Sequence, residues 1–295
     1  MSSDEERIKT LPCWNGAIEI APLHGGLSNA NYLVKDANGK HVVRFGKDYP
    51  FHHVSREREI MVARAADEAG FAPKLEYATP GVMVTQFLSA KTYAAQDVRK
   101  NAGRIAKLLR EFHADMANRL SGPGFIFWAF HVNRDYAITL RANNTRHLTL
   151  LDDMMRQNEA LEKAQSPLPI IFGHHDLLPA NFLDDGDKLW LIDFEYAGFG
   201  TAMFDLAGVA SNSQMTEDQS NVLLETYLGA KPDAAFKKSF AAMHCAALLR
   251  ETLWAMVSAI FLNAPGADYG AYVENNLALY RASINHYQSV YGTLK

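Results

Sequence analysis

The chain carries HHDLLPAN at residues 174–181 and LWLIDFE at residues 189–195, and the expected fold and chemistry both follow from these two stretches. Asp176 can accept a proton from a hydroxyl group. Asn181 and Asp193 offer hard oxygen ligands of the kind that Mg²⁺ prefers. The two stretches therefore predict a proton acceptor and a metal site that lie close together in the sequence.

The strand context around these residues supports this prediction. Short apolar runs at residues 170–172 and 189–192 predict buried strands, and DDGD at residues 184–187 is a turn signal between them. We expect the two strands to form a hairpin that brings Asp193 back beside Asn181.

The order H-x-D-x-x-x-x-N, followed by an apolar strand that ends in Asp, is typical of the catalytic segment of kinases. Isolated Asp and Asn residues are common in loops for reasons of turn geometry alone. Here the order, spacing and strand context of Asp176, Asn181 and Asp193 all agree with the kinase motif. Pro179 keeps the segment out of a regular helix. The sequence predicts phosphoryl transfer, with Asp176 as the base, His174 in the same catalytic motif, and Asn181 and Asp193 as metal ligands.

The composition of the 295-residue chain is that of an ordinary globular protein, with 48% hydrophobic and 21% charged residues. A net charge of −4 gives no electrostatic case for nucleic acid. No apolar run reaches the length of a membrane span, and residues 1–9 lack the apolar core of a signal peptide. Cys13 and Cys245 sit among apolar residues and are expected to be free thiols. We expect a cytoplasmic protein without nucleic-acid or membrane partners.

The hydrophobic pattern changes once along the chain and predicts two lobes of an α+β protein. Residues 1–88 alternate between strands and one helix, which is expected over residues 54–70 and capped by Ser55. Residues 89–295 form a larger and mostly helical lobe. The helices of this second lobe are expected over residues 99–120, 142–164, 234–262 and 272–291.

A glycine pair joins the first two predicted strands. Gly25 and Gly26 let backbone N–H groups approach phosphate oxygens, and Ser28 and Asn29 can add side-chain donors. A glycine pair in a hairpin is more often a simple turn, but its position in the small lobe favours phosphate binding.

Arg44, on the third predicted strand, stands where protein kinases carry a lysine. A guanidinium can hold a phosphate group and a helix carboxylate together. Glu59 on the following helix is the best candidate carboxylate and Glu57 is the alternative, although helix charges are often simply solvated. Gln86 and Leu88, at the expected hinge between the lobes, are predicted to contact the nucleotide.

These features together resemble the choline/ethanolamine kinases, within the aminoglycoside-phosphotransferase-like kinases. The segments that carry the resemblance follow one another in family order as GGLSN (25–29), VVRF (42–45), GFAPKL (70–75), HHDLLPAN (174–181), IDFEY (192–196) and FDLA (204–207). The resemblance implies a bilobal protein-kinase-like fold. It also implies ATP- and Mg²⁺-dependent phosphorylation of a small alcohol, choline or ethanolamine, with Asp205 as a brace for the catalytic loop.

Choline pockets in this family have aromatic walls and nearby carboxylates, which hold a quaternary ammonium through cation–π and charge interactions. The resemblance implies that Glu195, Glu251, Trp254 and Tyr272 bind the acceptor. Glu251 stands where the family has an aromatic residue, and Gly208-Val209 replaces the family's Asn-His pair. These departures concern the identity of the acceptor.

Several alternatives remain open at this point. Trp254 lies on an apolar helical stripe and can equally belong to the core, while Glu251 can pair with Arg250 and face water. The protein can also be a phosphotransferase for an aminoglycoside, a sugar or another alcohol, or a nucleotide-binding pseudokinase, although neither the base nor a metal ligand is lost. The expected partners are a small cationic alcohol and, in a homodimer, a second copy of the chain.

Overall fold

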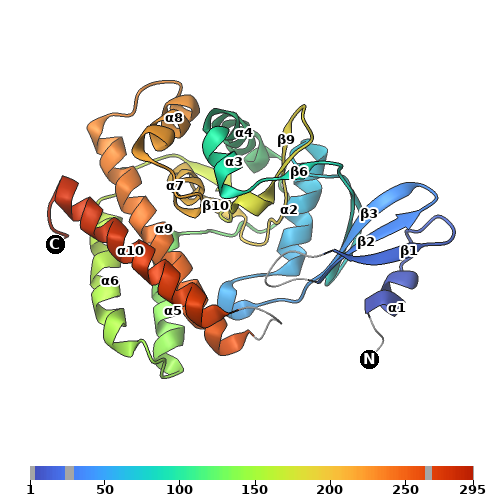
Figure 1. Cartoon of the computed structure of the whole chain (residues 1–295), viewed down its shortest axis with the longest axis horizontal. Helices are drawn as coiled ribbons and strands as arrows, with labels where there is room; N and C mark the ends of the chain where they lie inside the picture. Colours follow the sequence, from blue (N-terminus) through green and yellow to red (C-terminus); the bar gives the residue numbers. More distant parts are fainter. Residues whose placement is uncertain (1–3, 24–29, 263–267, 295) are drawn as a thin grey trace. The chain divides into compact units, whose positions relative to one another are not determined.

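The computed structural model describes residues 4–23, 30–262 and 268–294, and the chain forms two compact units (Figure 1). The first unit comprises Met1–Lys91 and Leu183–Glu195, and the second comprises Thr92–Phe182 and Tyr196–Lys295. Residues 183–195 were expected in the second lobe, whereas their contacts group them with the first unit.

A five-stranded antiparallel sheet with the order β1-β2-β3-β5-β4 forms the centre of the first unit (Figure 1). Its strands are β1 Glu19–Leu23, β2 Ala30–Asp36, β3 Gly39–Phe45, β4 Leu75–Thr79 and β5 Val82–Gln86. The β2–β3 turn closes on Asp36, whose Oδ1 accepts the N–H groups of Asn38 and Gly39. The buried valines of β2, β3 and β5 pack together into the sheet core.

Two helices and a 3-10 turn complete this unit: α1 Asp4–Lys9, η1 Pro50–His52 and α2 Arg56–Glu68. The prediction of α2 is confirmed, and Ser55 caps it by accepting the N–H of Arg58. The short helix α1 was not predicted, because six residues are too few for a periodic signal. Its Ile8 is fully buried in the sheet core.

The hairpin predicted between residues 170–172 and 189–192 is wrong. Strand β9 Leu189–Leu191 pairs with β8 Phe182–Asp184, so the DDGD turn joins β8 to β9. Strand β7 Ile170–Gly173 instead pairs antiparallel with β10 Gly198–Thr201 in the second unit. β10 escaped prediction because its sequence, GFGT, alternates with glycines that weaken a strand signal.

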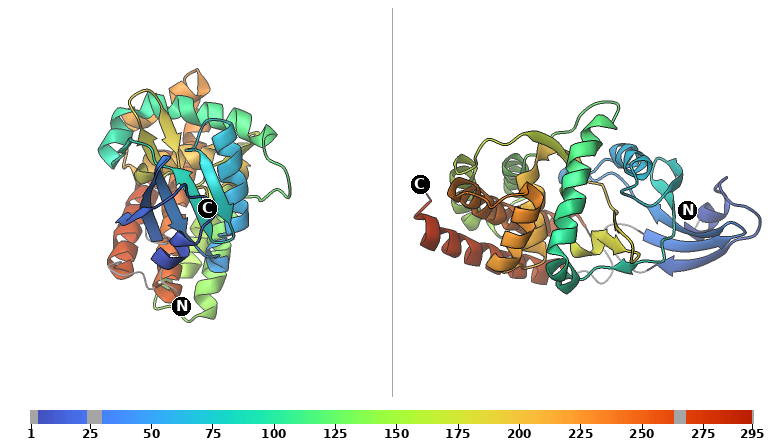
Figure 2. Two further views of the ribbon diagram at one scale, coloured as in Figure 1. Left: turned by 90° about the vertical axis from the view of Figure 1, so that its right-hand side faces the viewer. Right: turned by 90° about the horizontal axis from the view of Figure 1, so that it is seen from above.

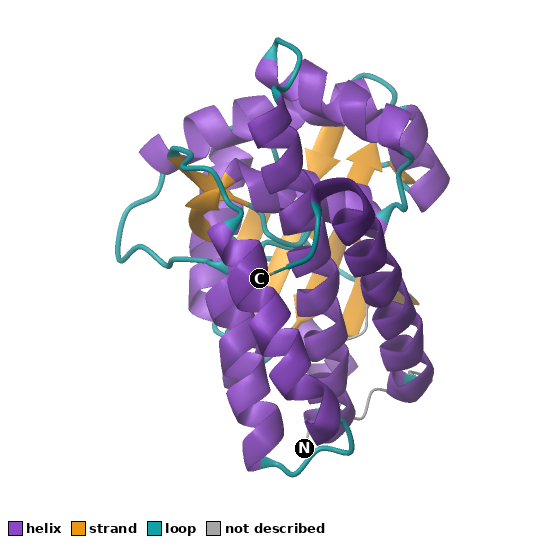
Figure 3. Ribbon diagram, turned by 90° about the vertical axis from the view of Figure 1, so that its left-hand side faces the viewer, coloured by secondary structure: helices purple, strands orange, loops and turns teal. Residues whose placement is uncertain are grey.

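The second unit is mostly helical (Figure 3). Its helices are α3 Ala95–Lys100, α4 Ala102–Asp115, α5 Ala129–Ala142, α6 Leu148–Lys163, α7 Ala202–Asn212, α8 Glu217–Leu228, α9 Ala234–Phe261 and α10 Tyr269–Tyr291, with 3-10 turns η2 Met116–Asn118 and η3 Pro179–Asn181. α9 is the central element: it packs against α5, α6 and α7, and α10 lies along it (Figures 1 and 2). The two-residue strand β6 Lys91–Thr92 precedes α3.

The predictions for α9 and α10 are confirmed to within a few residues, and so is the α+β class. The helix expected over residues 99–120 is interrupted at Asn101, and the one expected over 142–164 begins at Leu148. α7 was not predicted, because a helix that is buried on nearly all sides shows no amphipathic period. Within the described ranges, no helix combines the length and apolarity that a membrane crossing requires.

His41 on β3 links two carboxylates in the first unit. Its Nε2 lies 2.9 Å from Oδ1 of Asp36, and its Nδ1 is hydrogen-bonded to Glu76. Burial by itself would lower the pKa of His41, but hydrogen bonds and charge attraction from Asp36 and Glu76 outweigh it and raise the pKa. The two carboxylates therefore favour the protonated form of the imidazole.

A raised pKa makes His41 a source of pH-dependent stability. This contribution is complete below the pKa of an unfolded histidine, about 6.5, and is lost as the pH rises through the higher folded pKa. We expect the melting temperature to fall with rising pH in this window, and His41→Gln to flatten that slope. The exposed His131 supplies a matched control, His131→Gln, which should keep the wild-type slope. Melting followed by circular dichroism checks this, and an unchanged slope in His41→Gln would mean that His41 is neutral in the folded protein.

Candidate active site

Asp176 lies on the loop between β7 and η3 in the second unit. Its N–H donates to Nδ1 of His174 at 3.2 Å, and its main-chain carbonyl accepts Nδ2 of Asn181 at 2.7 Å. Pro179 starts the 3-10 turn η3, so the segment turns without forming a regular helix, as predicted. The structure thus brings together the predicted base and one predicted metal ligand. Because Nδ2 of Asn181 donates to the loop, Oδ1 is the atom that this amide can offer to a cation.

The carboxylate of Asp205 on α7 accepts backbone N–H groups of residues 174–181, the predicted catalytic loop. Oδ2 accepts the N–H of His174 at 2.8 Å and Nε2–H of His113 at 2.8 Å, while Oδ1 accepts the N–H of His175 at 2.7 Å. Burial alone would raise the pKa of Asp205, but attraction from His175 and the hydrogen bond from His113 outweigh it and hold the pKa well below its usual value. The contacts agree with a bracing role for Asp205. His174 belongs to the same set of contacts, because its N–H donates to Asp205 and its ring accepts the N–H of Asp176.

His175 takes an unusual backbone conformation for a residue with a side chain, with φ of 61°. Its imidazole stacks on Phe127, with ring centroids 4.5 Å apart and planes 13° from parallel. Its N–H is one of the two that Asp205 accepts. The Asp205 carboxylate and the stacking on Phe127 therefore hold the positive φ of His175, which is otherwise disfavoured. His175 directly precedes Asp176, the predicted base.

Arg44 of β3 is the centre of an ion cluster in the first unit. It pairs with Glu59 of α2, and its Nη1 donates to Oδ1 of Asp193 at 2.9 Å. The predicted Arg44–Glu59 contact is therefore present. Asp193, a predicted metal ligand, follows β9 and has φ of 68°, a positive angle like that of His175.

Arg56 is a second cation in this cluster, and it was not predicted. Its Nη1 donates to Oε2 of Glu59 at 2.6 Å and to Oε2 of Glu195 at 2.9 Å, and its side chain is 6% exposed. The Arg56-x-x-Glu59 spacing, one helical turn, was the signal that could have revealed it. Burial and the charge of Asp193 raise the pKa of Glu195 to about 7, against the opposing effect of Arg44 and Arg56. Glu195 is therefore engaged by Arg56, and its expected contact with the acceptor stays a prediction.

The other residues predicted to contact the nucleotide are the segment 25–29, Gln86 and Leu88. The glycine-containing segment at residues 25–29 lies outside the described residues. Gln86 ends β5, where its N–H donates to the carbonyl of Lys74, and the carbonyl of Leu88 accepts the N–H of Ala90. The roles of Gln86 and Leu88 in nucleotide binding stay predictions.

Three predicted acceptor residues meet in the second unit. Glu251 and Trp254 lie on α9, and Tyr272 on α10 donates from its hydroxyl to Oε1 of Glu251 at 2.6 Å. The rings of Trp254 and Tyr272 meet edge to face, with centroids 6.1 Å apart. Nε1 of Trp254 donates to the hydroxyl of Tyr196 at 2.9 Å, and Trp254 is only 9% exposed. Trp254 is therefore largely buried beside the Glu251–Tyr272 contact, and its expected contact with the acceptor stays a prediction.

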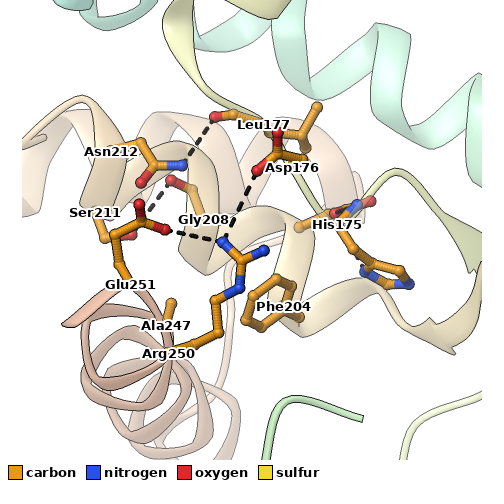
Figure 4. A pocket seen from close by; sticks show the side chains of 11 residues that line it. His175, Asp176, Leu177, Phe204, Gly208, Ser211, Asn212, Ala247, Arg250 and Glu251 are labelled. Carbon is orange, nitrogen blue, oxygen red and sulfur yellow. Dashed lines mark hydrogen bonds and ion pairs between the residues drawn. The ribbon is translucent and has the colours of Figure 1, made fainter. Parts of the chain in front are cut away.

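A pocket opens between the catalytic loop, α7 and α9 (Figure 4). The loop contributes Asp176, α7 contributes Ser211 and Asn212, and α9 contributes Arg250 and Glu251. The predicted base and one predicted acceptor residue thus line the same pocket. Its polar side chains can hydrogen-bond a hydroxyl group.

Arg250 lies between Asp176 and Glu251 in this pocket (Figure 4). Its Nη1 donates to Oε2 of Glu251 at 2.9 Å and lies 3.9 Å from Oδ1 of Asp176. Its guanidinium carbon lies 4.4 Å from the centre of the Tyr196 ring. Glu251 does pair with Arg250, as the alternative interpretation allowed, but its side chain is 13% exposed and lines the pocket. An Arg-Glu pair inside the apolar sequence AALLRETLWAM was the available sign of a buried polar site.

The predicted metal ligands suit a magnesium ion by their chemistry. Asn181 offers an amide oxygen and Asp193 offers a carboxylate, and both are hard donors. In the described part of the chain, no cluster of three or more His, Cys, Asp or Glu side chains forms a metal site by itself. Mg²⁺ needs only one or two protein ligands when phosphate oxygens and water complete its coordination.

Comparison with known proteins places the chain in a family. The model of the phosphotransferase enzyme family (APH) matches residues 19–240. The chain is 29% identical to a probable ethanolamine kinase of Arabidopsis thaliana, over 63% of this chain and 54% of that protein. It is 26% identical to the protein LicA of Haemophilus influenzae, over 69% of this chain and 61% of that protein. The matched regions thus span less than two thirds of the length of these two relatives.

Among solved structures, a choline/ethanolamine kinase family protein of Mesorhizobium loti is similar with a TM-score of 0.79 and 26% identity, over 95% of this chain and 94% of that one. These similarities confirm the resemblance to the choline/ethanolamine kinases and the protein-kinase-like fold. Since the family match takes in both the Arg44 cluster and the catalytic loop and covers well over half of the sequence, the chain belongs to the phosphotransferase enzyme family.

Proposed function

We propose that this chain is an ATP- and Mg²⁺-dependent kinase that transfers the γ-phosphate to the hydroxyl group of a small amino alcohol, with choline and ethanolamine as the first candidates. The observation that carries the proposal is the position of Asp176, on a braced loop and in a pocket that also contains Glu251. Relatives named as ethanolamine kinase and choline/ethanolamine kinase family protein support the choice of acceptor.

In this proposal, Asp176 accepts the proton of the acceptor hydroxyl as its oxygen forms a bond to the γ-phosphorus and the bond to the departing ADP oxygen breaks. Asn181 and Asp193 would hold Mg²⁺, which when bound would supply positive charge against the phosphate oxygens. Asp205 keeps the loop in place through the N–H groups of His174 and His175. Positioning and electrostatics thus supply the catalysis that phosphoryl transfer requires.

The nucleotide is assigned to the first unit. Arg44 provides a guanidinium for the phosphates, and Glu59 fixes its direction. Arg56 in turn holds Glu59 with a hydrogen bond of 2.6 Å, so Glu59 is fixed from two sides. Residues 25–29, Gln86 and Leu88 complete the proposed nucleotide contacts. A cytoplasmic homodimer is part of the same proposal.

We expect the purified protein to consume ATP when both Mg²⁺ and an amino alcohol are present. Release of ADP, followed in a coupled assay against choline, ethanolamine, the partly methylated ethanolamines, an aminoglycoside and a sugar, tests this. Chelation of Mg²⁺ should abolish the signal. Stimulation by the aminoglycoside or the sugar alone would replace the amino alcohol with that acceptor class. Binding of ATP with no turnover on any acceptor would instead identify a pseudokinase.

A further inference from the structure

The pocket beside Asp176 contains a cation that the chain itself supplies, the guanidinium of Arg250. We propose that Arg250 is a specificity-determining residue, which makes the pocket select primary and partly methylated ammonium groups over quaternary ones. The inference rests on the proposed function, since it assumes that the acceptor is an amino alcohol.

Glu251 is fixed in direction by two donors but retains capacity to accept more hydrogen bonds. Oε1 accepts from the hydroxyl of Tyr272 at 2.6 Å, and Oε2 accepts from Arg250 at 2.9 Å. A carboxylate has about four lone-pair positions, so each oxygen can accept a further hydrogen bond. A substrate N–H group that enters the pocket therefore finds a preorganised acceptor.

Arg250 places a positive charge against Glu251 in the pocket, and the same guanidinium lies 3.9 Å from Oδ1 of Asp176. Its guanidinium lies in direct contact with that carboxylate and also occupies one face of the Tyr196 ring at 4.4 Å. A quaternary ammonium has no N–H group and depends on Coulomb and cation–π attraction. Here the Coulomb attraction to Glu251 is offset by Arg250, and a face of Tyr196 is already occupied by a cation.

A primary ammonium is less sensitive to this offset. It can donate short, charge-assisted hydrogen bonds to Glu251, and these depend on contact geometry as well as on net charge. An ammonium that retains at least one N–H group gains the same kind of bond. The Arg250–Glu251 pair thus distinguishes acceptors by their ability to donate hydrogen bonds.

The environment of Arg250 argues that it serves the site rather than stability. The residue is 4% exposed, and within the described ranges its Nε and Nη2 atoms are buried without a hydrogen-bond partner. Burying a charged group with unmatched donors is unfavourable for folding. Arginine also stays protonated at any physiological pH, so the cation is a permanent part of the pocket.

Competition between ethanolamine and choline measures the selection directly. We expect the wild type to show a higher kcat/KM for ethanolamine. Arg250→Met keeps much of the side-chain length without the charge. It should shift the ratio toward choline by about tenfold, because it removes the cation that is paired with Glu251, the proposed partner of the ammonium group. Arg250→Lys retains the charge and should keep the wild-type preference. Lys238→Met removes an exposed cation from the same helix and serves as the control.

An unchanged ratio in folded Arg250→Met overturns the inference, as does an equal shift in Arg250→Lys. If Arg250→Met does not fold, the double variant Arg250→Met/Glu251→Gln removes both charges and should lose the preference for ethanolamine, and a retained preference there overturns the inference as well. A wild type that phosphorylates neither amino alcohol refutes the proposed function, and this inference with it. A wild type that phosphorylates both, at a ratio independent of Arg250, refutes the inference alone.

Discussion

Asp176→Ala should lower turnover by about 10²–10⁴-fold, the usual contribution of a positioned base, while the affinity for nucleotide changes by no more than a few-fold. The reason lies in which atoms of Asp176 hold the loop. Asn181 donates to the main-chain carbonyl of Asp176 at 2.7 Å, and the N–H of Asp176 donates to His174, so both contacts persist when the carboxylate is removed. Only the longer contact of 3.4 Å from Nδ2 of Asn181 to Oδ2 of Asp176 is lost. The variant therefore separates proton transfer from loop structure.

Steady-state turnover and calorimetric titration with Mg²⁺ and ATP measure the two quantities for Asp176→Ala. Asp187→Ala, which removes an exposed carboxylate from the β8–β9 turn, is the matched control and should behave as the wild type. If Asp176→Ala kept more than about a tenth of the wild-type turnover, Asp176 would lose its assignment as the base.

Asp205→Ala should produce the largest loss of stability of any substitution considered, about 3–5 kcal/mol, because it removes one partner from a buried network of charges. The Asp205 carboxylate is fully buried and accepts hydrogen bonds from three residues. Its loss leaves the N–H groups of His174 and His175 and the ring of His113 without their acceptor. The backbone of His175, with its positive φ, loses one of the two interactions that fix it, so turnover should fall as well.

Denaturant unfolding at neutral pH measures the stability of Asp205→Ala, with Asp218→Ala on α8 as an exposed control. The depressed pKa of Asp205 adds a second readout. Its contribution to stability is present above the pKa of an unfolded aspartate, about 3.9, and is lost as the pH falls through the lower folded pKa. The variant should therefore show a shallower loss of stability in acid. A denaturation midpoint equal to that of the wild type would contradict the bracing role.

The catalytic loop was predictable because its information is local. Asp176, Pro179 and Asn181 lie within one short segment, and each has a chemical or conformational meaning that survives without knowledge of the fold. Arg44 and Glu59 were also within reach, since the strand and the helix that carry them have clear periodic patterns. The structure adds the contacts that hold these residues in place.

Arg56 and Arg250 carry only weak signals in the sequence, the Arg56-x-x-Glu59 spacing and the Arg250-Glu251 pair in an apolar run, because the importance of these arginines depends on burial. A charged residue is solvated in most proteins, and the sequence does not say which arginine is enclosed by carboxylates from distant segments. Dependence on tertiary structure also explains why β7 was wrongly predicted to pair with residues 189–192. Its true partner, β10, has the sequence GFGT, and only the tertiary pairing of Gly173 with Gly198 identifies it as a strand.

Helix α9 presents Arg250, Glu251 and Trp254 within little more than one turn, whereas the base and its brace lie on other segments of the chain. Under the proposed function, the residues assigned to acceptor recognition and those assigned to proton transfer therefore lie on separate segments of the chain. On that assignment, a few codons at residues 250–254 are the expected place for one acceptor to be exchanged for another. Under the proposed function, surveying natural variation in this one turn of helix is a practical way to sort related enzymes by the alcohols they phosphorylate.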